Sequence, residues 1–269
     1  MKRDEGVAET TIDKFVSGNM QEYPHQPLPL KKIIKNSLSI TWENKFSLFF
    51  TLIIPYSLAA FLALMQIQST SFYGPIAGFA IISLSSLISV LYTVSCHRFV
   101  LLGKSSVPFW GILVPAKREI RFWGWTITLF LIFGIFGMLI AIAIGLTGLL
   151  FGLLKVIPQS FIFILLVFPL GYLFSRWVLI FPAVAIDERP GLAWAWEKSK
   201  GNGWRLLLLI AIPFIPGTAL SLFLPHGRPL LLEGMVVCFS FVFAVLGIVF
   251  ISLSYQELCI DEDNDSNGN

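Results

Sequence analysis

The chain has 269 residues, of which 56% are hydrophobic and only 13% are Asp, Glu, Lys or Arg. A soluble domain carries roughly 25% charged residues, so these charges are too few to cover the surface of a soluble protein of this size. The composition therefore excludes a soluble enzyme, a disordered chain and a nucleic-acid-binding domain, and it predicts an integral membrane protein.

Both ends of the chain are polar. Residues 1–28 mix charged side chains with Gly, Pro and Gln, which predicts a disordered cytoplasmic tail. Residues 261–269 predict a second, acidic disordered tail, for which docking on a basic partner is the alternative. The start of the chain lacks the short apolar core of a cleavable signal peptide, so we expect the first span to act as the insertion signal. Residues 29–260 form the predicted membrane domain.

Six long apolar stretches predict six transmembrane helices, because a helix needs about 20 apolar residues to cross a bilayer. They are continuously hydrophobic instead of alternating, which favours an all-α membrane protein over a β-barrel. The 33 uncharged residues from Phe122 exceed one straight crossing, so we expect a tilt, a kink or a returning segment after Gly145. The predicted spans are 46–66, 75–97, 123–145, 159–181, 204–224 and 231–255.

The basic residues predict the orientation of these spans. Seven Lys and Arg residues precede the first span, and the segments 98–121 and 176–205 hold five each. The other connecting turns hold only Lys155 and Arg228. Because basic residues accumulate on the cytoplasmic side, we expect both termini and the longer segments in the cytoplasm.

A segment before each odd-numbered span has the pattern of a helix lying in the membrane interface. In the first, apolar residues recur every fourth position with lysines between them, which is the pattern of an amphipathic helix. The alternative is that these segments are loops whose tryptophans pack on helix ends. The apolar residues are Leu30, Ile34, Leu38 and Trp42 in the first segment, Trp110, Ile112 and Leu113 in the second, and Leu192, Trp194 and Trp196 in the third, which stops at Gly201.

All eight tryptophans lie at or near the predicted cytoplasmic ends of the spans. Tryptophan favours the headgroup boundary, where its ring is buried and its N–H stays wet. We therefore interpret them as anchors in the inner-leaflet interface. They are Trp42, Trp110, Trp123, Trp125, Trp177, Trp194, Trp196 and Trp204.

The spacing of the span ends indicates an internal repeat. The residues that open the odd-numbered spans recur every 79 positions, and those that close the even-numbered spans recur every 78 positions. We expect three tandem parallel hairpins, each preceded by an interfacial helix, in units 29–102, 103–181 and 182–260. The opening and closing residues are Phe46, Trp125, Trp204, Phe99, Trp177 and Tyr255.

One stretch of the chain has a recognisable pattern. It reads RWVLIFPAVA at 176–185, then Ala193-Trp194, then SKGNGWR at 199–205. This pattern resembles poorly characterised six-helix proteins of the bacterial inner membrane, and it is similar to the membrane domain attached to some glycerophosphodiester phosphodiesterases. The resemblance implies a six-helix domain in the bacterial cytoplasmic membrane. It implies no phosphodiesterase activity, because the soluble catalytic domain has no counterpart in the chain.

Two arginines lie at matching places in the first two units. Arg176 falls in the inner half of a span, where a charged group is costly and usually faces a partner or a wet cavity. Arg98 occupies the equivalent position. One interpretation is that both snorkel to the headgroups. The other is that Arg98 and Arg176 converge on a lipid phosphate, with His97 and Glu257 nearby, because guanidinium binds phosphate through paired hydrogen bonds.

Two classes of function stay open. The predicted spans carry no central carboxylate for ion coupling, and the sequence lacks zinc-binding, nucleophile-elbow and phosphate-loop motifs. We therefore expect a non-catalytic membrane protein, without cofactor or metal, that binds inner-leaflet phospholipid, including anionic phospholipid, or scaffolds protein partners. The alternative is a transporter or channel component for a small or lipid-like solute. A wet cavity reaching the middle of the spans favours transport, whereas a dry bundle with a basic, aromatic rim favours lipid binding.

Overall fold

The computed structural model describes residues 27–69, 74–151, 159–223 and 230–260, and the regular structure in these ranges is entirely helical. Both predicted disordered tails, apart from residues 27 and 28, lie outside the described residues.

In the described ranges, six long helices form three hairpins, one at the place of each predicted pair of spans. Five apolar segments, on α3, α4, α5, α10 and the run of α6 into α7, are long enough to cross a membrane, which indicates a multi-pass membrane protein. In α9 the apolar stretch is shorter, Gly203–Pro216. The bounds are α3 Lys45–Ser69, α4 Gly74–Leu102, α5 Lys117–Phe151, α6 Gln159–Trp177, α9 Gly203–Phe223 and α10 Leu230–Tyr255.

The shorter elements all gather at one end of the molecule. We call this end the base, and it comprises residues 27–47, 97–125, 176–205 and 252–260. Most buried side chains of the described chain lie in the base or in the helix turns next to it. The short elements are α2 Leu30–Glu43, η1 Lys104–Ser106, α7 Ile180–Ala185, α8 Leu192–Lys198 and η2 Gln256–Ile260.

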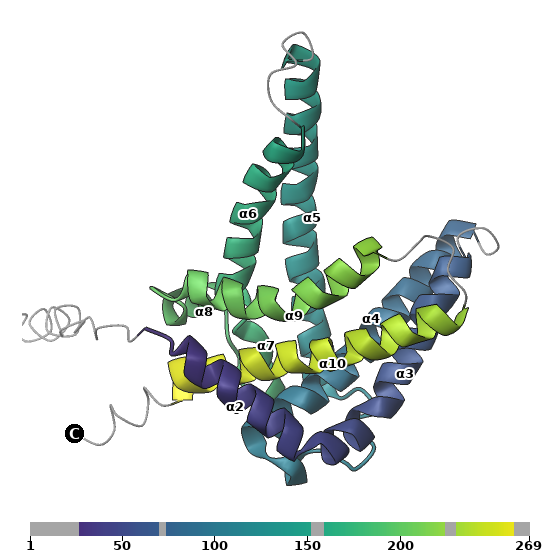
Figure 1. Ribbon diagram of the computed structural model, residues 1–269, viewed down its shortest axis with the longest axis vertical. Helices are drawn as coiled ribbons and strands as arrows, with labels where there is room; N and C mark the ends of the chain where they lie inside the picture. Colours follow the sequence, from purple (N-terminus) through teal and green to yellow (C-terminus); the bar gives the residue numbers. More distant parts are fainter. Residues whose placement is uncertain (1–26, 70–73, 152–158, 224–229, 261–269) are drawn as a thin grey trace, which may run out of the picture.

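The three hairpins diverge from the base instead of standing side by side (Figure 1). At the base, α4 packs on α5, α6 on α9, and α10 on α4. Farther out, α5 and α6 stand apart from the other hairpins, and α10 runs across their direction (Figure 1). The structure therefore differs from the predicted parallel arrangement about one axis. The difference arises because packing between hairpins is concentrated at the base, and the apolar outer halves have few protein neighbours to align them.

The first and third predicted interfacial helices are present as α2 and α8. In α2, Ile33 and Ser37 are buried. The apolar residues predicted to form one face of this helix divide between the protein core and the exposed surface. Leu30 and Ile34 pack against the core, whereas Leu38 and Trp42 are exposed. The α8 helix is shorter and ends at Lys198 with Ser199 as its C-cap, before the predicted stop at Gly201, whose φ of 76° falls in the turn that follows.

The second predicted interfacial helix is wrong. Residues 103–116 contain only the single turn η1 and otherwise follow an irregular path. Gly111 has a φ of 77°, and an added Cβ there would lie 2.2 Å from the carbonyl oxygen of Thr51. The backbone of the loop thus lies directly against α3, a close approach that only glycine permits. This contact, instead of a continuous helix, determines the path of the loop.

The long third span is one helix of 35 residues. It continues straight through Gly145 to Phe151, so no returning segment begins between these two residues, and residues 152–158 lie outside the described chain. At 1.5 Å per residue the helix is about 52 Å long, well beyond a hydrocarbon core of about 30 Å. Most of its apolar side chains beyond the base, among those that the structure describes, are exposed.

Candidate functional site

The signature stretch 176–185 folds into the centre of the base. It ends α6 and forms α7, in which every residue from Pro182 to Ala185 is buried together with Ile180. This short helix, which follows directly after α6, contacts α4, α5 and α10. These three helices belong to three different hairpins, so α7 touches all of them. Its small side chains permit this close packing.

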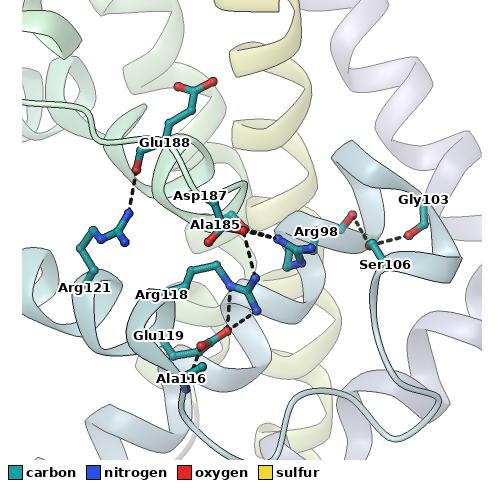
Figure 2. Close-up of polar contacts among 10 residues, drawn as sticks. All are labelled: Arg98, Gly103, Ser106, Ala116, Arg118, Glu119, Arg121, Ala185, Asp187 and Glu188. Carbon is teal, nitrogen blue, oxygen red and sulfur yellow. Dashed lines mark hydrogen bonds and ion pairs between the residues drawn. The ribbon is translucent and has the colours of Figure 1, made fainter.

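The turn that follows α7 receives arginines from two other helices (Figure 2). Arg98 Nη1, from α4, donates to the carbonyl oxygen of Ala185 at 3.0 Å and to Oδ2 of Asp187 at 3.1 Å. Arg118 Nη1, from α5, donates to the same Asp187 oxygen at 3.2 Å. Asp187 adopts a left-handed φ of 74°, which turns the chain so that its carboxylate faces both guanidinium groups.

A second carboxylate completes this network from within α5. Glu119 is fully buried, and its Oε1 accepts bonds from Nε and Nη2 of Arg118 at 2.8 and 2.6 Å. Its Oε2 accepts the backbone N–H of Ala116 at 3.0 Å, which satisfies one free donor at the start of the helix. Both carboxylate oxygens are therefore used, as expected for a buried charge.

Glu188 ties the same turn to the end of the last hairpin. Its carboxylate Oε1 accepts the hydroxyl of Tyr255 at 2.6 Å, and its backbone carbonyl accepts Arg121 Nη1 at 3.2 Å (Figure 2 shows the second bond). Polar groups from α4, α5 and α10 thus converge on residues 185–188. Positive and negative groups are matched here, so the arrangement is suited to joining the hairpins.

Arg176 lies in a different cluster, which joins α6 to α8. Its side chain is buried; Nε donates to Ser199 Oγ at 2.7 Å and Nη2 to the carbonyl oxygen of Trp196. The guanidinium also lies 4.0 Å from the centroid of the Trp196 ring, a favourable cation–π distance. Gly203 packs against it, since an added Cβ would lie 2.8 Å from Arg176 Cδ.

His97 occupies a third position, between α4 and α10. Its ring is almost fully buried, and Nδ1 lies 2.7 Å from the hydroxyl of Ser252. Glu257, expected near the arginines, instead pairs with Lys32 of α2 at 2.6 Å.

The predicted site residues therefore do not share a hydrogen-bonded cluster. Arg98, Arg176 and His97 each bond to protein groups in separate parts of the base, because backbone carbonyls and hydroxyls approach them there. One donor is left over, since Arg98 Nε is buried without a hydrogen-bond partner among the described residues. A phosphate shared by the two arginines stays a prediction. The hydrogen bonds that the structure shows for both arginines are made to protein groups.

The eight tryptophans fall into two groups of four in the structure. Trp123, Trp125, Trp177 and Trp194 are partly buried and pack against the core cluster around α7. The other four are exposed: Trp42, Trp110, Trp196 and Trp204. The interpretation of the tryptophans as interfacial anchors stays a prediction, and the four exposed ones are available for that role.

Sequence reasoning missed a cavity of about 550 Å³ between the first and third hairpins. Its lining is mostly apolar, from α3, α4, α9 and α10, and Pro213 and Gly247 contribute to it. Tyr56 and Tyr92 meet edge to face at one wall, with ring centroids 5.5 Å apart. Tyr56 lies about 11 residues from the start of α3, or about 16 Å along the helix, so the cavity reaches well beyond the base.

Comparisons of the chain with protein-family models, with curated proteins and with solved structures found no match.

Proposed function

We propose that this protein is a non-catalytic, multi-pass protein of a bacterial cytoplasmic membrane whose base binds phospholipid of the inner leaflet. The observation that carries the proposal is the combination of exposed aromatic rings and lysines at the base. Aromatic side chains stabilise a protein at the boundary between headgroups and acyl chains, and lysines there attract anionic lipid. Both termini face the cytoplasm in this proposal.

Helix α2 supports the proposal most directly. It lies across the base and packs on α10, α9 and α3 (Figure 1). Its buried side anchors it to the protein, while Leu38 and Trp42 are exposed and Lys31 and Lys35 are exposed beside them. Lys45 lies 3.9 Å from the centroid of the Trp42 ring, so a cation and an indole are presented together. An amphipathic surface of this kind binds in the plane of a membrane.

The exposed apolar surface of α5 supports insertion in a bilayer. A helix that is hydrophobic all round and hardly buried in protein needs an apolar environment, which lipid provides. We extend this to six crossings, with α9 as the sixth, and to three similar hairpin units. Acyl chains would fill the spaces between the diverging hairpins and align them along the membrane normal. This architecture is the one implied by the resemblance of residues 176–205 to six-helix inner-membrane proteins.

The proposal is tested by the lipids that the protein retains. The protein is extracted from bacterial membranes in a mild detergent, purified, and analysed for bound lipid by mass spectrometry alongside the source membrane. We expect phosphatidylglycerol and other anionic lipids to be enriched at least about threefold over the membrane, since about 1 kcal/mol per basic residue is gained near an anionic surface. A retained mixture with the composition of the membrane would contradict the proposal.

A second function is favoured by the cavity between the first and third hairpins. Its volume of about 550 Å³ and mostly apolar lining fit part of an acyl chain, with Thr93, Ser240 and the two tyrosine hydroxyls as the polar exceptions. This geometry fits passage of a lipid-like solute better than passage of an ion. Proteoliposomes with fluorescent phospholipid in both leaflets distinguish the two functions, because only a transporter makes the inner-leaflet dye accessible to an external reductant.

A further inference from the structure

A second cavity, of about 600 Å³, lies in the base between the start of α3 and η1. Four of its six lining residues are polar, and none of the six is acidic. Two come from the first turns of α3 and two from η1. The lining residues are Ser47, Thr51, Lys104, Ser105, Val107 and Phe109.

The polar groups of this cavity have no partner among the described residues. The hydroxyls of Ser47, Thr51 and Ser105 make no hydrogen bond with the described chain, and the Lys104 ammonium makes no ion pair there. Thr51 is only 5% exposed. Ser47 is half-buried, and Lys104 and Ser105 are exposed, so the cavity is open to the outside on their side. Buried polar groups are nearly always hydrogen-bonded, so the buried Thr51 hydroxyl calls for a ligand or water in this space.

The turn that carries Lys104 is held in place by the base. Gly103 starts it with a φ of 86°, and Ser106 Oγ donates to the carbonyl oxygens of Gly103 at 2.7 Å and Arg98 at 3.0 Å (Figure 2). On the other side, Gly111 packs against the backbone of Thr51. The loop is therefore fixed to the end of α4 on one side and to α3 on the other, which keeps the four polar groups around the same space.

These groups form a set of hydrogen-bond donors suited to an oxyanion. Lysine binds phosphate as a point charge, and hydroxyls donate to the remaining oxygens. Apolar rings adjoin the set: Phe109 stacks on Phe50 at 5.5 Å between centroids and meets Trp110 at 4.8 Å, and all three rings are exposed. A soluble phosphate would leave these rings in water, whereas the glycerol and acyl part of a phospholipid would cover them.

We propose that this cavity binds the phosphate of an inner-leaflet anionic glycerophospholipid, with Lys104 and the hydroxyls of Ser47, Thr51 and Ser105 as donors and the Phe50–Phe109–Trp110 rings against the lipid body. The inference rests on the proposed function and assigns it a site other than Arg98 and Arg176. These two arginines are engaged with the protein, whereas the donors of this cavity are available.

The test measures binding of short-chain phosphatidylglycerol to the full-length protein in detergent by native mass spectrometry. Lys104→Ala removes the charge, and Thr51→Val removes one hydroxyl at almost unchanged volume. Lys117→Ala is the matched control, because Lys117 is also an exposed lysine of the base but does not line the cavity. We expect Lys104→Ala to weaken binding about tenfold and Thr51→Val about threefold to tenfold, as for lost charged and neutral hydrogen bonds, with Lys117→Ala within about twofold of the natural protein.

Three results would overturn the inference. Equal effects of Lys104→Ala and Lys117→Ala would show that only the general positive charge matters. An unchanged affinity in Thr51→Val, with an unchanged melting midpoint without lipid, would remove the hydroxyls from the site. Competition by inorganic phosphate at the same concentration as the lipid would show a site for soluble phosphate.

The lipid content of the natural protein separates this inference from the proposed function. If the natural protein retains no excess of anionic lipid, the proposed function fails. If the natural protein and Lys104→Ala retain the same excess, the function stands and the site assignment alone fails.

Discussion

The buried carboxylate of Glu119 provides a quantitative test of how the base is held together. Glu119→Gln keeps the shape of the side chain but replaces one of its two acceptor oxygens by a donor. In the structure both oxygens are used, one by two N–H groups of Arg118 and the other by the N–H of Ala116. Whichever way the amide is turned, its NH₂ group faces a donor and at least one buried N–H loses its acceptor.

The size of the effect follows from these contacts. A buried donor left without a partner costs about 1–3 kcal/mol, and the bonds that Arg118 keeps lose the assistance of the carboxylate charge. Complete loss of one member of a buried ion pair costs about 3–5 kcal/mol, but Arg118 retains Asp187 at 3.2 Å. We therefore expect Glu119→Gln to destabilise the protein by about 2–4 kcal/mol.

Thermal unfolding of the purified protein in detergent measures this loss. At about 2–4 °C per kcal/mol for chains of 150–250 residues, the expected fall in the midpoint is roughly 4–16 °C. Glu197→Gln is the control, because Glu197 is exposed and its Lys200 partner is 3.6 Å away, so its loss is worth less than about 1 kcal/mol. A midpoint for Glu119→Gln equal to that of Glu197→Gln would refute the importance given to the Arg118–Glu119–Asp187 network.

Two further predictions concern packing, and both use the same melting assay. Gly111→Ala should destabilise the protein more than Gly103→Ala. Both positions have a positive φ, which costs about 1–2 kcal/mol in strain, but only the Cβ at Gly111 meets the Thr51 backbone, at 2.2 Å. Equal losses would contradict this close approach. Ala183→Leu should cost at least about 1–3 kcal/mol by overfilling the centre of the base, whereas Ala193→Leu on the exposed side of α8 should cost less than about 0.5 kcal/mol; a stable Ala183→Leu protein would mean that α7 is not tightly packed.

The long helices could be predicted because their signal is local and strong. Each apolar run is longer than a soluble helix needs, and its limits are marked by charges, prolines or glycines. The α2 helix could be predicted because its apolar residues recur at every fourth position. The side of the helix that faces the protein could not, because the burial of Ile33 and Ser37 depends on where α10 lies.

The loop 103–116 shows where a local pattern fails. Trp110, Ile112 and Leu113 form an apolar group like that of an interfacial helix, but contact with α3 decides the conformation there. The glycine at position 111 is the signal in the sequence, because glycine is the residue most often found where the backbone must turn or approach closely.

The polar sites depended on tertiary structure. The sequence indicates that Arg98 and Arg176 are charged groups in need of a partner. In the structure their partners include the backbone carbonyls of Ala185 and Trp196, which no side-chain pattern reveals. The cavity at Lys104 combines residues from two elements more than 50 positions apart, and Ser47 and Thr51 have no distinguishing feature in the sequence. Such a site becomes visible only when the loop is placed against α3.

The orientation of the base in the membrane is the claim on which the proposed lipid contacts depend most. It is measured by fusing alkaline phosphatase, active only outside the cytoplasm, and green fluorescent protein, fluorescent inside it, to chains ending at Lys104, Lys155, Lys200 and Arg228. We predict fluorescence without phosphatase activity at Lys104 and Lys200, and phosphatase activity without fluorescence at Lys155 and Arg228. Phosphatase activity at Lys104 or Lys200 would contradict it, because the exposed indoles and the Lys104 cavity would then face the outer leaflet.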